Sequence, residues 1–243
     1  MRLSNPIGPR GFGDGTLVPF ADCMWTATTP VRFAATWQAH VMTVIRLSGG
    51  GVLLHSPCRP SSALLEAIVE LGRVTDVVAP NWFHDLYLAD YRAAYPHARF
   101  WGPRVLKRQR KGLIDGILDG EERPEWFREL PYVTVPGLLT FDESVFYHVP
   151  TRTLIAADLL LNASIVDDAP LFTRFVYRIF HFDGSLKVFP LLFWFGQARR
   201  RAVVAAVQKI VEWNPQRIIV GHGTPIDHDA GQQLGEAFAL INR

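Results

Sequence analysis

Apolar and polar positions change their spacing along the chain, and each change marks a different predicted element. Residues 41–47 and 52–55 are two β-rich apolar runs on either side of Ser48-Gly-Gly-Gly51, which predicts an antiparallel hairpin. Between residues 61 and 72 apolar side chains recur at helical spacing, with a serine available as N-cap and a glycine at the end. A short apolar run at 75–79 then predicts a buried strand. The pattern therefore passes from antiparallel β structure into α/β alternation.

Similar patterns return in the second half of the chain. Further strands are predicted near 99–101, 132–135, 144–148, 153–157 and 217–220, and further helices near 86–95, 104–111 and 197–213 and from Thr224, which is placed to cap the last helix. Residues 1–16 and 112–131 are expected to be irregular, so Gly11-Phe-Gly13-Asp-Gly15 is interpreted as a loop and not as a phosphate-binding turn. A run of strands followed by α/β alternation occurs twice, which favours a mixed α/β fold.

Composition narrows the class of protein. The chain has 243 residues, of which 49% are hydrophobic and 20% charged, so we expect one globular domain over 1–243. The formal net charge of +2 argues against a protein that binds nucleic acid through a basic face. Cys23 and Cys58 stand apart, which predicts reduced thiols and neither a disulfide framework nor a zinc ribbon. The N-terminal residues show no secretory signal pattern, so a cytoplasmic location is expected.

Candidate chemistry lies just past the ends of predicted buried strands. These positions are residues 81–85, Asp158 and Gly221-His222-Gly223. The carboxyl ends of strands form the edge at which α/β sheets bind ligands. Asp158 stands between apolar runs, and a buried carboxylate needs a partner or a cation. The glycines beside His222 allow its backbone to approach another segment closely. His55 ends the hairpin and either enters this site or bonds locally, whereas His40, His97 and His228 are expected to be exposed.

In these segments the sequence resembles the metallo-β-lactamase-fold superfamily, and within it a branch known as a domain of unknown function. The resemblance runs from about residue 42 to the C-terminus and rests on Met42-Thr-Val-Ile-Arg-Leu47, Leu54-His-Ser-Pro57, Val78-Ala-Pro-Asn81, His84, Thr153-Leu-Ile-Ala-Ala-Asp158 and Val220-Gly-His-Gly223. It implies a four-layer αβ/βα sandwich in which two sheets pack face to face with helices outside. It also implies a metal site at one edge, between the sheets.

The superfamily's motif, His-x-His-x-Asp-His, is incomplete in this chain. Aligned from Asn81, it places Asn81 and Phe83 at the first two histidines, Asp85 at the aspartate and Leu86 at the last histidine. The further histidine that precedes the Asp158 strand in the superfamily has no match, because His148 lies within a predicted strand.

The resemblance assigns Asp158 to the bridging aspartate and His222 to the final histidine. It therefore implies metal ligands at Asp85, Asp158 and His222, with His84 substituting for a lost histidine by a one-residue shift. Such a set suits at most one zinc, iron or manganese ion. Asp85, Asp158 and His222 would then serve metal-assisted hydrolysis of a small-molecule substrate, or oxygen chemistry.

A metal-free interpretation of the same residues stands beside this one. Asp85 would cap the following helix, His84 would pack on the sheet edge, and Asp158 and His222 would form a buried hydrogen-bonded pair. The chain would then be a non-catalytic binding or interaction protein on the same fold.

An apolar insert is predicted over residues 168–196. Its first half carries a one-sided stripe at helical spacing, formed by Leu171, Phe172, Phe175, Val176, Ile179 and Phe180. Core packing is the ordinary explanation for such a stripe, and a hydrophobic lid over the substrate is the second. The third is a peripheral membrane or dimer contact through residues 171–195, because Arg199-Arg-Arg201 follows with positive charge.

Overall fold

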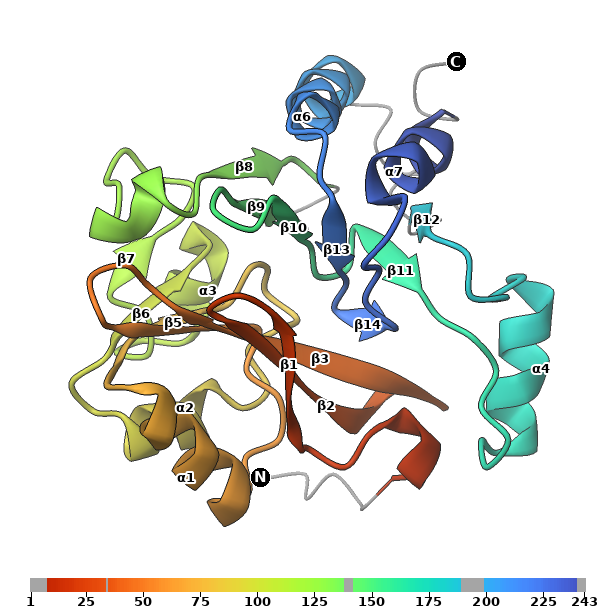
Figure 1. Cartoon of the computed structure of the whole chain (residues 1–243), viewed down its shortest axis with the longest axis horizontal. Helices are drawn as coiled ribbons and strands as arrows, with labels where there is room; N and C mark the ends of the chain where they lie inside the picture. The colour runs from red at the N-terminus through yellow and green to blue at the C-terminus, as the bar shows by residue number, and fades with distance from the viewer. Residues whose placement is uncertain (1–7, 34, 138–141, 189–198, 240–243) are drawn as a thin grey trace.

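The computed structural model describes residues 8–33, 35–137, 142–188 and 199–239. A seven-stranded sheet forms the first half of the molecule (Figure 1). Its strands, in order across the sheet, are β1 (Leu17–Ala21), β2 (Met24–Phe33), β3 (Thr36–Arg46), β4 (Val52–His55), β5 (Val74–Val78), β6 (Arg99–Gly102) and β7 (Gly116–Ile117). Neighbours from β1 to β4 are antiparallel and those from β4 to β7 are parallel. The predicted hairpin is therefore confirmed as β3 and β4.

Two smaller sheets form the second half. The four-stranded sheet has the order β13-β10-β9-β8, and its strands are β8 (Tyr132–Val135), β9 (Glu143–His148), β10 (Thr153–Ile155) and β13 (Arg217–Ile219). The three-stranded sheet has the order β12-β11-β14, and its strands are β11 (Leu160–Asn162), β12 (Lys187–Val188) and β14 (His222–Gly223). The pairs β10/β13 and β11/β14 are parallel, so the chain after β10 and the chain after β13 run side by side.

Helices cover the outer faces of the seven-stranded and the four-stranded sheets (Figure 1). The helices are α1 (Ser62–Leu71), α2 (Leu88–Ala94), α3 (Arg104–Gln109), α4 (Leu171–Ile179), α6 (Arg200–Glu212) and α7 (Ala230–Phe238), with short 3-10 helices η1 (Arg10–Phe12) and η2 (Glu125–Arg128). Apolar side chains of α1, α2 and α3 pack on the first sheet, and those of α6 and α7 pack on the second. A third cluster lies between the two sheets. The predicted four-layer αβ/βα sandwich is thus the observed architecture.

Strand β4 shows how the sequence produces these layers. Successive side chains of a strand point to opposite faces of the sheet. Val52 and Leu54 join the helix-side cluster, while Leu53 joins the cluster between the sheets. Because His55 follows Leu54, it also faces the second sheet, where its ring meets that of Phe146.

Most predicted helices form near the expected positions, but the predicted first residue of the last helix is wrong. Helix α1 begins as predicted, since the Ser61 hydroxyl accepts a hydrogen bond from the backbone N–H of Leu64. Thr224, in contrast, does not cap the last helix, because α7 begins only at Ala230. Ile226 instead exchanges two backbone hydrogen bonds with Ile218 in β13. Pairing with a buried strand here prevails over a local capping signal.

Two segments are more ordered than their patterns suggest. Residues 112–131 contain β7 and η2, which are too short to give a periodic signal. Strands β1 and β2 lie in a threonine-rich stretch for which no strand was predicted. β2 pairs with β3 along its whole length, from Met24↔Ile45 to Phe33↔Thr36, so its backbone partner stabilises it despite weak alternation.

The apolar stripe of the insert does not lie in the core, so the prediction of core packing is wrong for it. The exposed large hydrophobic residues of this segment are Leu171, Phe172, Phe175, Ile179 and Phe180. The end of the predicted insert, residues 189–196, falls outside the described residues. Helix α4 lies at the side of the molecule, beyond β11 and the end of β3 (Figure 1).

The two cysteines differ in environment, and this predicts their reactivity. Cys58 is buried, and its burial raises the pKa of its thiol to about 12, whereas Cys23 is exposed. Because the thiolate is the reactive form, we expect iodoacetamide to alkylate one thiol in the folded protein and two after denaturation. Mass spectrometry of the labelled protein measures the count. The variant Cys23→Ser should show no labelling while folded, and rapid native labelling of Cys58 would contradict the prediction.

Candidate functional site

Three of the predicted residues meet at one edge between the sheets. His84 follows β5, Asp158 follows β10, and His222 lies in β14. The Nε2 atoms of His84 and His222 lie 3.3 Å and 3.0 Å from Asp158 Oδ2 and Oδ1. One possible ligand atom from each residue lies within 4.8 Å of the other two. His84 is buried, whereas the side chains of Asp158 and His222 are 18% and 14% exposed, so the cluster is reached from their side.

Close backbone contacts bring His222 to Asp158. A Cβ atom on Gly221 would lie 2.8 Å from the Cα of Ala157, and one on Gly223 would lie 2.0 Å from the carbonyl oxygen of Asn162. Gly223 also has a φ of 116°, which side chains rarely allow. The glycines on both sides of His222 therefore have the close-approach role that the sequence indicated.

The orientation of His222 is set by a backbone carbonyl. Its Nδ1 lies 2.7 Å from the carbonyl oxygen of Ala39, which can only accept, so Nδ1 carries a proton. Nε2 therefore faces Asp158. It donates a hydrogen bond when the ring is a protonated imidazolium, and it presents a lone pair when the ring is neutral. Burial alone would lower the pKa of His222, but the hydrogen bond and charge of Asp158 outweigh it and raise that pKa. Burial would raise the pKa of Asp158, yet His84 and His222 hold it well below its usual range.

His84 is held by a buried hydroxyl. Ser56 Oγ lies 2.5 Å from His84 Nδ1 and 3.0 Å from Nε2 of His40. His40 Nε2 also lies 3.2 Å from the backbone carbonyl oxygen of Ser56, which can only accept, so this nitrogen carries a proton and Ser56 Oγ accepts from His40. When the Ser56 hydroxyl donates to His84 Nδ1, the proton of a neutral His84 is on Nε2, facing Asp158. When His84 Nδ1 instead donates to the second lone pair of Ser56 Oγ, the Nε2 of His84 is free.

His40 was expected to be exposed, and the structure corrects this, because it is only 3% exposed. It lies in the middle of β3, where the cluster covers it. Burial, together with His84 and His222, lowers the pKa of His40 well below its usual value, so its ring is neutral. No sequence motif links His40 with Ser56, and only the fold brings the two side chains together.

Asn81 occupies the position of the superfamily's first histidine but acts as a donor. Its Oδ1 accepts hydrogen bonds from the backbone N–H groups of Phe83 and His84. The amide Nδ2 must then point the other way, where it donates to Asp158 Oδ2 at 2.8 Å and Glu143 Oε2 at 3.1 Å. An amide N–H₂ group has no lone pair for a metal, so Asn81 positions Asp158 and is no ligand in this orientation.

Glu143 is a further site residue that the sequence did not reveal. It opens β9, is 4% exposed, and accepts backbone N–H bonds from Ala157, Asp158 and Leu159 at 2.7–2.9 Å. Burial and then the charge of Asp158 raise the pKa of Glu143 to about 7, against the effect of these donors. The only signal in the sequence was an acidic residue directly before a predicted buried strand. Glu143 fixes the backbone that carries Asp158.

Asp85 lies apart from this cluster. Its Oδ2 accepts a hydrogen bond from Arg110 Nε at 2.7 Å, just past the end of α3. His84 and Asp85 are adjacent in a turn, so when His84 points inward Asp85 points towards α3. Leu86, at the motif's last histidine, is 48% exposed. Asp85 is therefore too far from His84, Asp158 and His222 to be grouped with them as a metal ligand.

His55 is fully buried beside Phe146, and its Nε2 has no hydrogen-bond partner among the described residues. Burial, with a contribution from His84, lowers the pKa of His55 from 6.5 to about 3. The unfolded chain therefore binds one proton more than the folded chain between these pH values. This difference decreases stability as pH falls, by about 1.4 kcal/mol per pH unit.

We accordingly expect His55→Leu to lose less stability than the wild type between pH 6 and pH 4. Urea unfolding across this range measures the slope. His228→Leu is the matched control, because His228 is 76% exposed and should leave the slope unchanged. Equal slopes in the wild type and both variants would contradict a proton-linked role of His55.

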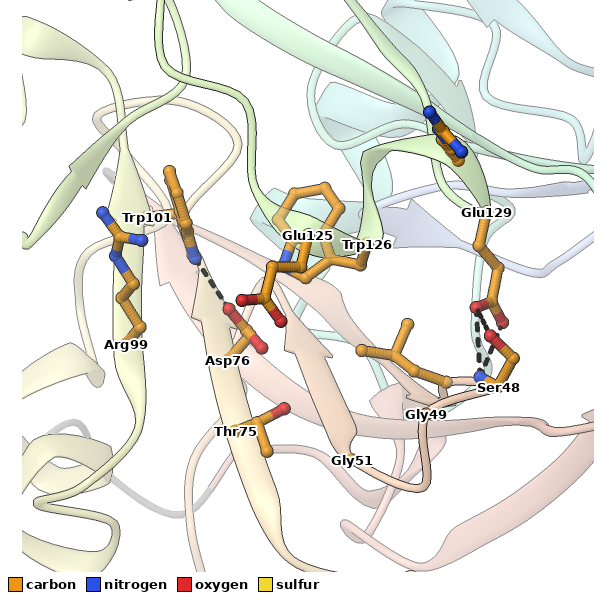
Figure 2. A pocket seen from close by; sticks show the side chains of 12 residues that line it. Ser48, Gly49, Gly51, Thr75, Asp76, Arg99, Trp101, Glu125, Trp126 and Glu129 are labelled. Atoms are coloured by element: carbon orange, nitrogen blue, oxygen red, sulfur yellow. Dashed lines mark hydrogen bonds between the residues drawn. The ribbon is translucent and has the colours of Figure 1, made fainter.

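A cavity of about 580 Å³ lies at the other edge of the first sheet. Figure 2 shows its lining, in which Trp101 donates to Asp76 and Ser48 donates to Glu129. Asp76 lies at the centre of β5, whereas the His84 cluster follows the end of that strand. The cavity lining contains no histidine, so its carboxylates are separate from the candidate metal site.

Comparisons with known proteins identify the family and the fold. A family model described as "Domain of unknown function (DUF4336)" matches residues 22–176. Comparison with curated proteins gives no significant match.

Among solved structures, a metallo-β-lactamase from Pontibacter korlensis is 14% identical, with a TM-score of 0.61 over 94% of this chain and 99% of that one. A putative diflavin flavoprotein fragment from Nostoc sp. PCC 7120 is 13% identical, with a TM-score of 0.65 over 95% and 97%. The metallo-β-lactamase FIM-1 from Pseudomonas aeruginosa, in its mono-zinc form, is 15% identical, with a TM-score of 0.58 over 93% and 95%. At these identities the similarity establishes the fold alone.

Proposed function

Because the chain belongs to the DUF4336 family and has the metallo-β-lactamase fold, we propose that it binds one divalent metal ion for metal-assisted hydrolysis of a small molecule. The ligands would be His84 Nε2, an oxygen of Asp158 and His222 Nε2. The observation that carries the proposal is this convergence of two imidazoles and one carboxylate at the sheet edge.

The surroundings of the three residues suit a metal. Two histidines and one carboxylate are a ligand set found for zinc and for non-haem iron, with positions left for water. The hydrogen bond of His222 Nδ1 to Ala39 leaves Nε2 as its only ligand atom. Ser56 Oγ can accept a hydrogen bond from the Nδ1–H of His84, which frees Nε2 in the same way. Outer partners of this kind orient metal-binding histidines.

A second ion is not expected. Asn81 directs a donor at Asp158, and Phe83 has no ligand atom, so the positions of the superfamily's first two histidines offer no ligand atom to a metal.

When bound, a metal ion would act as a Lewis acid and lower the pKa of a coordinated water. Asp158 would balance its charge, and Asn81 and Glu143 would hold Asp158 in place. Loading requires His84 and His222 to lose their Nε2 protons, so metal affinity should fall as pH decreases.

The test is elemental analysis of the full chain purified without chelator, followed by reconstitution with zinc, iron or manganese alone. We expect one equivalent, and hydrolysis of esters, lactones, β-lactams or phosphodiesters only by the loaded protein. Asp85→Asn is the control, because its carboxylate pairs with Arg110 and its loss should leave metal content unchanged. Two tightly bound equivalents would contradict the proposal. No bound metal would favour the non-catalytic alternative, for which the cluster is a buried hydrogen-bonded network.

A further inference from the structure

Helix α4 is amphipathic, but its apolar side faces solvent. Leu171 is 83% exposed, Phe172 53%, Phe175 59% and Ile179 56%, and Phe180, just past the helix, is 51% exposed. Single exposed hydrophobic residues are ordinary on a protein surface, whereas a contiguous set marks an interaction surface. These five residues lie at helical spacing, so they form one continuous apolar face, which we call the α4 face.

Polar groups attach the opposite side of the helix to the protein. Thr173 is fully buried, and its hydroxyl accepts a hydrogen bond from the backbone N–H of Trp37. Tyr177 is also buried and donates from its hydroxyl to the carbonyl oxygen of Trp37. Two hydrogen bonds to one residue of β3 thus set the rotation of the helix. The hydrophobic residues of the α4 face are not needed for this attachment.

Helix α4 itself carries positive charge and no acidic residue. Arg174 and Arg178 lie on α4, and neither forms an ion pair among the described residues. Residues 171–180 contain no aspartate or glutamate. A two-fold contact between two α4 faces would bring together four arginines from helices that themselves carry no acidic residue, which is unfavourable. The nearest acidic residues in the sequence, Asp167, Asp168 and Asp183, lie outside the helix. An apolar face flanked by arginines is complementary to a surface that is hydrophobic inside and anionic outside.

We propose that α4 docks this protein on an anionic lipid surface, with the α4 face among the acyl chains and Arg174 and Arg178 at the headgroups. The helix has nine residues, which is too short to cross a hydrocarbon core of about 30 Å. In the part of the chain that the structure describes, no helix is long and apolar enough to cross a membrane. The proposal does not depend on metal binding.

The test is co-sedimentation of the full chain with phosphatidylcholine vesicles that contain or lack phosphatidylglycerol. We expect binding to the anionic vesicles, and about tenfold weaker partitioning for Phe175→Gln, because a Phe side chain is removed from the lipid. Val69→Gln is the matched control, since Val69 is 60% exposed on α1 against 59% for Phe175. It should bind like the wild type.

A second pair of variants tests the charges. Arg174→Gln and Arg178→Gln should each weaken binding to anionic vesicles about fivefold. Binding of the wild type should also weaken between ~0.1 M and ~1 M salt, where the screening length shortens from about 10 Å to about 3 Å. No vesicle binding, or equal loss in Phe175→Gln and Val69→Gln, would overturn the proposal. So would a wild-type dimer in analytical ultracentrifugation that Phe175→Gln converts to monomer.

Discussion

Asp158→Asn is expected to abolish metal binding and to remove any effect of chelator on the melting temperature. Asp158 contacts both histidines of the proposed ligand set and is its only carboxylate. A bound ion stabilises only the state that binds it, by about 2.7 kcal/mol when the free metal is at a hundred times its Kd. For a chain of this size that corresponds to a melting temperature about 5–10 °C higher. Chelator should therefore lower the melting temperature of the wild type by that amount and leave Asp158→Asn unchanged.

Differential scanning fluorimetry with and without chelator measures this effect. Asp85→Asn serves as control and should respond to chelator as the wild type does, because Asp85 pairs with Arg110 outside the cluster. The metal-free interpretation predicts another result. Asp158→Asn would then break charge-assisted bonds to His84 and His222 and cost about 1–3 kcal/mol, with or without chelator. A wild type that is indifferent to chelator, with a destabilised variant, would leave the non-catalytic alternative as the better account.

Glu143→Ala is expected to destabilise the fold more than any other single change at the site. The carboxylate accepts hydrogen bonds from three consecutive backbone N–H groups, those of Ala157, Asp158 and Leu159, and from the amide of Asn81. Alanine would leave these donors buried without an acceptor, and each such donor costs about 1–3 kcal/mol. We therefore expect a loss of more than ~3 kcal/mol in the free energy of unfolding.

Urea denaturation of the metal-free proteins separates this effect from metal binding. Glu143→Gln should lose less, because its remaining carbonyl oxygen still accepts hydrogen bonds. Glu66→Ala on the exposed face of α1 is the control and should stay within about 0.5 kcal/mol of the wild type. If Glu143→Ala is also within this margin, the backbone after β10 does not depend on the carboxylate.

The helices and strands that the sequence predicts well are those whose signal is local. The Ser61 cap and the apolar spacing of α1 lie within one segment, as do the two runs and glycine turn of β3 and β4. The same holds for the ends of β5, β10 and β13, so His84, Asp158 and His222 could be named as candidates before their contacts were known. Where a long-range partner decides the structure, local signals fail. Thr224 is the example, since pairing of Ile226 with Ile218 displaces the start of α7.

The partners within the site depend on segments far apart in the chain. His222 bonds to Ala39 across 183 residues, and Asn81 bonds to Asp158 across 77. The sequence near His40 does not mark it as part of the site. Ser56 lies in a segment that carries the family resemblance, and Glu143 precedes a predicted buried strand, but neither signal assigns these residues to the site.

The sequence by itself therefore determined the alternation of strands and helices and which strand ends carry polar residues, because side-chain periodicity and turn chemistry act over a few residues. The sandwich that these elements form was implied by the resemblance to a known fold. Only the tertiary structure decided that His84 joins Asp158 while Asp85 turns to Arg110. It also decided that α4 faces the protein with Thr173 and Tyr177 and the solvent with its apolar residues. The physical reason is that hydrogen-bond partners and burial depend on how segments pack, and one amphipathic pattern is compatible with either side facing inward.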